Sequence, residues 1–152
     1  MNELEIRVNT VIEAIRNRLG NSHFSNELGL ELEEFKESDI CPVASFIYRK
    51  KDNHLNNYDA LHGGIVASIF DTAMGLGAAG LSNSKVTTTE MSVSFLRPAM
   101  GDCFRTVVEY GHVGSNLVHA TAKLYAVNGD SGEEILCATS QGGYFILRME
   151  LE

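Results

Sequence analysis

The chain has 152 residues, of which 44% are apolar and 21% charged, the balance of a folded globular protein rather than of a disordered chain. Its 20 acidic residues outnumber its 12 lysines and arginines, so the net charge is −8. Because nucleic acids and anionic membranes are bound through basic surfaces, this charge argues against both as partners. The length fits one domain, which we expect to span residues 1–152.

The first predicted element is an amphipathic helix over residues 3–19. Its apolar residues recur at helical spacing on one face: Leu4, Val8, Val11, Ile12, Ile15 and Leu19. The pair Gly20-Asn21 predicts a left-handed cap at its end. Residues 1–20 are therefore expected to form a helical extension that either covers an edge strand or closes over a site.

Two strands and a second helix follow. From Leu28 the apolar period changes to two, which predicts one strand, and residues 43–49 predict another. After a polar loop over residues 50–59, an apolar helix is predicted over residues 63–79. The apolar stretch from Leu61 to Leu81 is long enough to cross a bilayer, but Asp71 and five glycines interrupt it. We therefore expect this helix to be surrounded by its own protein.

The remainder of the chain predicts β-structure. A strand of alternating residues follows Lys85 and ends at Arg97-Pro98, since proline cannot continue a ladder. Further strands are predicted near 102–111, 117–127 and 134–147, where Gly142-Gly143 predicts a bulge or a bend. We expect an α+β fold, in which an antiparallel sheet of five or six strands, ending in a meander of about four, curls around one long helix.

The cysteines argue against a structural zinc site. Cys41, Cys103 and Cys137 are widely spaced, without a Cys-x-x-Cys pair or a Cys/His cluster. A reduced chain located in the cytoplasm is the expectation. The charged first residues, which lack the apolar run of a signal peptide, agree with that location.

The candidate chemistry lies where the apolar helix begins. Gly63 and Gly64 carry no Cβ, so a ligand can approach the first helical N–H groups, which are suited to an oxyanion. The same pair is also a plain turn signal. His62 caps the helix or orients a substrate group, and Asn56 is either a loop residue or a second polar group of the site. We expect all of these groups to be directed at one helix mouth.

Asp71 lies two helical turns further along, on a face of small residues. A buried carboxylate is costly unless it is paired, so Asp71 is either a structural group bonded across an interface or a functional group.

These residues resemble the signature of hotdog-fold acyl-CoA thioesterases, in particular the phenylacetate-degradation branch. His62-Gly63-Gly64 begins six residues after Asn56, and Asp71 follows nine residues after His62. The segment 87–99, with Arg97-Pro98 near its end, is similar to the family's strand that ends in a proline, and the match extends from about Leu28 to Phe145.

The resemblance implies hydrolysis of acyl-CoA thioesters to free acid and coenzyme A. Asp71 would act as general base or as nucleophile, and the sequence does not decide between these roles. The Gly63 N–H would polarise the thioester carbonyl, while Asn56 and His62 would position the thioester or the water.

Other parts of the site are implied in the same way. Gly64 would contact substrate, and Thr88 would reach the site from the neighbouring subunit, with Thr87 or Thr89 as alternatives one position away. The resemblance further implies a homodimer with two shared sites, often a dimer of dimers and so a homotetramer, with neither a cofactor nor a metal.

Two other functions stay open: a hotdog protein that binds acyl-CoA without turnover, and a hotdog hydratase or dehydratase. A pure binder gains nothing from a carboxylate beside a neutral thioester, so Asp71 favours hydrolysis. Asn56 and His62 keep a histidine-centred hydratase site open. Apolar residues such as Phe70 and Met74 favour medium or longer acyl chains.

Overall fold

The computed structural model describes residues 1–148. Its elements, in chain order, are α1 (Glu3–Asn21), α2 (His23–Leu28), β1 (Glu31–Lys36), β2 (Val43–Arg49), the short 3₁₀ helix η1 (Asp52–His54), α3 (Gly63–Ser82), β3 (Lys85–Phe95), β4 (Cys103–Val113), β5 (Leu117–Val127) and β6 (Glu134–Leu147).

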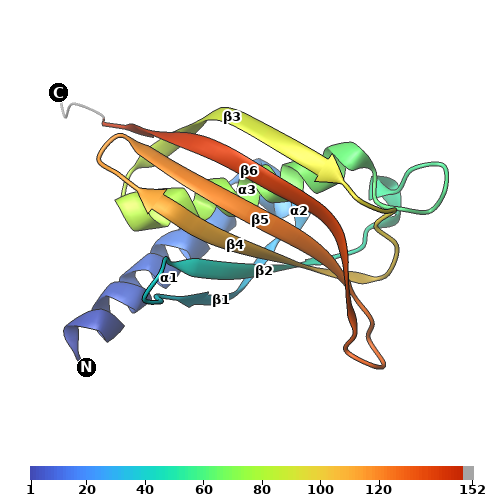
Figure 1. The fold of residues 1–152 in the computed structure, drawn as a ribbon, viewed down its shortest axis with the longest axis horizontal. Helices are drawn as coiled ribbons and strands as arrows, with labels where there is room; N and C mark the ends of the chain where they lie inside the picture. The colour runs from blue at the N-terminus through green and yellow to red at the C-terminus, as the bar shows by residue number, and fades with distance from the viewer. Residues whose placement is uncertain (149–152) are drawn as a thin grey trace.

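The six strands form one antiparallel sheet in the order β1-β2-β4-β5-β6-β3. The sheet curls across α3, which lies behind it in Figure 1. Alternate residues of the inner strands, such as Ala44, Phe46 and Tyr48 of β2, are fully buried against the helix. This is the hotdog arrangement, and the predicted α+β fold is confirmed.

The long helix α3 is buried as expected. By length and composition it could cross a membrane, yet 56% of its most apolar window is buried inside the fold. Ile69, Phe70 and Met74 are fully buried beneath the sheet. The apolar character of α3 is therefore that of a core helix.

The predicted strand order is wrong in one respect. Strands β4, β5 and β6 form a meander of three, whereas β3 lies at the far edge of the sheet and pairs with β6. The connection from β2 through α3 carries the chain across the sheet to that edge. The alternating pattern of β3 predicts that it is a strand but not its neighbour, because pairing depends on contacts distant in the sequence. The crossover leaves β3 as an edge strand, with most of its residues exposed.

The N-terminal region is more helical than predicted. Leu28 ends the short helix α2 and does not start a strand, and Ser22 caps α2 by accepting a hydrogen bond from the Ser25 N–H. The predicted left-handed cap at Gly20-Asn21 is also absent, since α1 ends at Asn21 and is followed by Ser22 in an extended conformation.

Helix α1 packs against α3 and β1. Val11 and Ile15 of α1 are buried, and a Cβ on Gly80 of α3 would lie 3.0 Å from the Ile15 side chain. The missing side chain at Gly80 thus allows the close approach of the two helices. The extension is therefore a fixed part of the core, packed against α3 and the edge strand β1.

The irregularity predicted at Gly142-Gly143 lies in the opposite strand. The pairing of β3 with β6 shifts between Thr88 and Glu90, so that Thr89 is the extra residue. A Cβ on Gly143 would lie 2.8 Å from the Thr89 hydroxyl, which explains why a glycine faces the bulge. The bulge breaks the strict alternation of β3 and makes Thr88 a cross-strand partner of Tyr144.

Candidate active site

The loop before α3 is anchored to the sheet. The His54 ring is buried, stacks on Tyr48 and shares a 2.7 Å hydrogen bond with its hydroxyl. The His54 carbonyl accepts the His62 N–H at 3.0 Å, and the Ala99 carbonyl accepts the Leu61 N–H at 3.0 Å. The start of α3 is therefore held in a fixed position relative to the sheet.

The first turn of α3 has one free backbone amide. His62 is the N-cap, and its Nδ1 accepts the Gly64 N–H at 2.9 Å. The N–H groups of Ile65 and Val66 both donate to the His62 carbonyl. Within residues 1–148 the Gly63 N–H has no acceptor. The capping role of His62 is confirmed, and only Gly63 keeps an amide available to an oxyanion.

Asn56 lies near this amide. Its Oδ1 accepts the N–H groups of Tyr58 and Ala60, at 2.9 and 3.2 Å, and so shapes its own loop. Asn56, Gly63 and the exposed ring of Phe95 line one hollow of about 330 Å³. A carbonyl group in this hollow can be met by the Gly63 amide and by the Asn56 side chain.

Two hydroxyl groups hydrogen-bond to the Asp71 carboxylate and hold it in place. The Thr88 hydroxyl donates to Asp71 Oδ1 at 2.8 Å, and the Tyr144 hydroxyl donates to the same oxygen at 3.0 Å. In the part of the chain that the structure describes, no donor reaches Oδ2. Asp71 is half-buried in one chain, and the two hydroxyl groups are its hydrogen-bond partners. The arrangement fixes the carboxylate and leaves one oxygen free for chemistry.

Tyr144 was not among the predicted residues. It lies on β6 opposite Thr88, and a Cβ on Gly75 of α3 would come within 3.2 Å of its ring. Burial first, and then the Asp71 carboxylate, raise the pKa of Tyr144 well above its ordinary value. The phenol therefore stays protonated as a donor. Nothing local in the sequence marks it, since it lies 73 residues from Asp71.

Thr88 and Thr87 are now distinguished. We expected Thr88 to reach the site from the neighbouring subunit, but it donates to Asp71 of the same chain. Thr87 pairs with Phe145, and no side-chain hydrogen bond joins it to Asp71 among the described residues.

The two groups of candidate residues do not meet within one chain. Asp71 follows Gly63 by eight residues in α3, a distance of about 12 Å along the helix axis. Gly63 and Asn56 line the hollow at the helix mouth, whereas Asp71, Thr88 and Tyr144 line a separate depression. The expectation that all of them converge on one helix mouth is wrong for a single copy.

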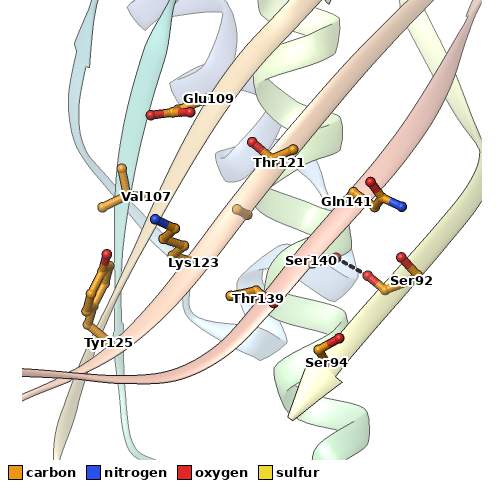
Figure 2. Close-up of a pocket in the computed structure, with 11 residues that line it drawn as sticks. Ser92, Ser94, Val107, Glu109, Thr121, Lys123, Tyr125, Thr139, Ser140 and Gln141 are labelled. Carbon is orange, nitrogen blue, oxygen red and sulfur yellow. Dashed lines mark hydrogen bonds between the residues drawn. The ribbon is translucent and has the colours of Figure 1, made fainter. Parts of the chain in front are cut away.

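A third hollow, of about 410 Å³, lies on the outer face of the sheet. Figure 2 shows its hydroxyl, amide and charged side chains standing on the strands, with α3 behind them. Ser140 donates a 2.8 Å hydrogen bond to the Ser92 carbonyl there. Since Asp71 and Gly63 belong to α3, this hollow lies across the sheet from them.

No cluster of three or more histidine, cysteine, aspartate or glutamate side chains able to hold a metal occurs in residues 1–148. The three cysteines are unpaired. That the activity needs neither a metal nor a cofactor stays a prediction.

A hotdog fold with a helix carboxylate and a free helix N-terminal amide defines a class of thioester hydrolases. The thioesterase superfamily matches residues 58–133, which is half of the chain. The chain belongs to this superfamily. The matched residues include Gly63, Asp71 and Thr88.

Similar proteins agree with this membership. The chain is 24% identical over 140 residues to the protein of Escherichia coli strain K12 named medium/long-chain acyl-CoA thioesterase YigI, covering 81% of this chain and 84% of that protein. A putative esterase of Halobacterium salinarum is 33% identical over 79 residues, covering 49% of this chain and 52% of its own length.

Solved structures share the fold. A thioesterase family protein from Silicibacter pomeroyi superposes with a TM-score of 0.80 at 27% identity, over 90% of this chain and 98% of that one. The PaaI protein of the phenylacetic acid degradation operon of E. coli superposes with a TM-score of 0.79 at 17% identity, over 93% of this chain and 96% of its own.

Proposed function

We propose that this chain hydrolyses acyl-CoA thioesters with medium or long acyl chains, in a site completed by a second copy of the chain. The observation that carries the proposal is the division of the site. One end of α3 offers the free Gly63 amide, and Asp71, about 12 Å along the helix, offers a fixed carboxylate with one free oxygen. The similarity to the E. coli protein named as a medium/long-chain acyl-CoA thioesterase supports the substrate class.

In the proposed reaction, the thioester carbonyl oxygen accepts the Gly63 N–H of one copy, with Asn56 beside it. Asp71 of the partner subunit faces the carbonyl carbon with Oδ2. As general base, it takes a proton from water while the water oxygen attacks that carbon. As nucleophile, Oδ2 attacks directly and water then hydrolyses the mixed anhydride. In both routes the C–S bond breaks and coenzyme A leaves as a thiol. Its sulfur takes up the proton that Asp71 removed from water in the general-base route, or a proton from solvent water in the nucleophile route.

The same proposal includes a homodimer, two of which form a homotetramer, in the cytoplasm. Edge strand β3 supports the dimer, because its 11 residues present an unpaired ladder that a second β3 can continue. At its end Phe95 and the next residue, Leu96, are exposed by 57% and 51%, which favours burial against a partner. Three unpaired cysteines fit a reducing compartment.

The direct test of turnover is Asp71→Asn. The amide has the same shape and still accepts hydrogen bonds from Thr88 and Tyr144, so we expect the fold, the dimer and acyl-CoA binding to persist. Because an amide neither takes up a proton nor attacks a thioester, turnover should fall by about 10²–10⁴-fold. Release of free thiol from dodecanoyl-CoA measures the rate, and calorimetry measures binding.

Asp130→Asn is the matched control, since Asp130 lies in the exposed turn between β5 and β6. It should hydrolyse at the wild-type rate. If a folded Asp71→Asn protein kept wild-type turnover, Asp71 would have no part in the reaction. If the wild-type protein bound acyl-CoA without releasing thiol, the chain would be a binding protein.

A further inference from the structure

The depression that contains Asp71 extends away from it towards the N-terminal helices. It has a volume of about 700 Å³, within the range of sites for small ligands. Asp71, Thr88 and Tyr144 form one part of its lining. The apolar part is supplied by α2, α3, β3 and β6 through Phe24, Leu76, Ala79, Val86 and Leu147. An apolar surface thus begins beside the carboxylate.

Phe24 is an aromatic residue of this lining whose side chain is not packed into the core. Its side chain is 54% exposed, whereas Ser25 and Leu28 are the residues through which α2 is buried. Helix α2 is also held by Lys51, whose ammonium group donates to the Glu27 carbonyl. Since the phenyl ring faces solvent at the edge of a hollow, a ligand that covers it gains apolar burial without disturbing the core.

The N-terminal wall of the depression is rigid. Arg18 of α1, which also lines the hollow, donates to the carbonyls of Ala14 and Ser84 and so ties the end of α1 to the turn after α3. Val11 and Ile15 are buried beside Gly80. The distance between Phe24 and Asp71 is therefore fixed by packed helices. A wall at a fixed distance can select ligands by their length, whereas a closing lid would move.

We propose that this depression binds the acyl chain of the substrate and that Phe24 determines the preference for chain length. The inference rests on the proposed acyl-CoA hydrolysis, and it assigns the short helix α2 a role in specificity. A short acyl group occupies the part next to Asp71, whereas a longer one reaches the phenyl ring. Each methylene group that is buried along the way should raise kcat/KM about three- to fourfold until the chain has passed Phe24.

The test measures kcat/KM for saturated acyl-CoAs from butyryl to hexadecanoyl in the wild-type protein and in Phe24→Ala. We expect the dodecanoyl-to-butyryl ratio to fall about tenfold in the variant, because only the longer chain loses a contact. Phe24→Leu, which keeps an apolar side chain, should fall between the two. Leu4→Ala is the matched control, since Leu4 is 57% exposed on the neighbouring helix α1 but outside the depression. Its ratio should equal that of the wild type.

The outcomes separate the two proposals. Suppose that all variants hydrolyse acyl-CoA and have the melting temperature of the wild type. If the dodecanoyl-to-butyryl ratio of kcat/KM is then the same in Phe24→Ala as in the wild type, the chain-length role is refuted while acyl-CoA hydrolysis stands. If Leu4→Ala lowers the ratio as much as Phe24→Ala does, the effect is not that of this wall, and the inference is again refuted. If the wild-type protein hydrolyses no acyl-CoA of any length, the proposed function fails and the inference fails with it.

Discussion

Two neutral hydroxyls on one carboxylate oxygen are the most informative detail at the scale of single residues. Thr88 and Tyr144 both donate to Asp71 Oδ1, so the side chain cannot rotate without losing two hydrogen bonds. Hydrogen bonds to a charged group are each worth about 1.5–3 kcal/mol. The free oxygen, Oδ2, is therefore held in a defined direction before substrate arrives.

Removing one of these donors tests the positioning role. Tyr144→Phe keeps the ring that packs against Gly75 and deletes only the hydroxyl. We expect kcat to fall about tenfold with KM within twofold of wild type, because Thr88 still holds Oδ1 and the binding surface is unchanged. Steady-state kinetics with dodecanoyl-CoA give both constants.

Tyr125→Phe is the control for removing a phenol. Tyr125 stands on the outer face of the sheet (Figure 2), across the sheet from α3, and its variant should show wild-type kinetics. Equal kinetics for Tyr144→Phe and the wild type would mean that the phenol does not position the carboxylate.

The sequence predicts one part of this site and not the other. Asn56, His62, Gly63 and Asp71 stand at local spacings around one helix, so that spacing alone indicates them. Tyr144 reaches Asp71 only through the pairing of β3 with β6, and the bulge at Thr89 decides which threonine faces inwards. Neither the pairing nor the bulge is a local property of the sequence.

At the scale of elements, α3 can pack closely under the sheet because glycines on the helix leave room for large side chains of the strands. A Cβ on Gly77 would lie 1.8 Å from the Tyr110 hydroxyl oxygen, which donates to the Ala73 carbonyl at 3.0 Å. Tyr110 is fully buried, and burial raises its pKa far above the ordinary value, so its hydroxyl remains a donor.

Gly77→Ala should therefore destabilise the fold. The added methyl group displaces a buried ring and breaks its hydrogen bond, which we expect to lower the free energy of unfolding by about 2–4 kcal/mol. Gly20→Ala is the matched control in a helix, since nothing lies within 4 Å of a Cβ on Gly20. It should raise the free energy of unfolding by up to about 1 kcal/mol.

Urea denaturation of both variants measures these changes. A Gly77→Ala protein as stable as the wild type would show that Tyr110 can move aside, and that the approach of α3 to the sheet does not depend on this glycine.

The sequence predicts some of the helices and strands correctly and misses others. The bounds of β2 and β6 agree with the prediction because alternation is clear between turn signals. Helix α2 was missed, since six residues after Ser22 are too short for a helical period to show. The position of β3 beside β6 was missed because the residues of a strand do not determine by themselves which strand it pairs with.

At the scale of the whole molecule, one chain holds apart the two groups that the proposed reaction brings together. One chain carries the free amide and the fixed carboxylate on the same rigid helix, in two different depressions. A helix cannot bring two of its own turns together. Two copies related by a two-fold axis can place Gly63 of each opposite Asp71 of the partner subunit, forming two equivalent sites.

The most direct measurement of this central claim is complementation between two inactive variants. Gly63→Val blocks approach to the amide, and Asp71→Asn removes the carboxylate, so each homodimer should lack both working sites. A heterodimer of the two variants, co-expressed with different tags and purified through both, contains one site with an intact Gly63 and an intact Asp71. We predict that it recovers about half of the wild-type thioesterase activity per dimer. A correctly folded heterodimer no more active than either parent homodimer would contradict a site shared between subunits.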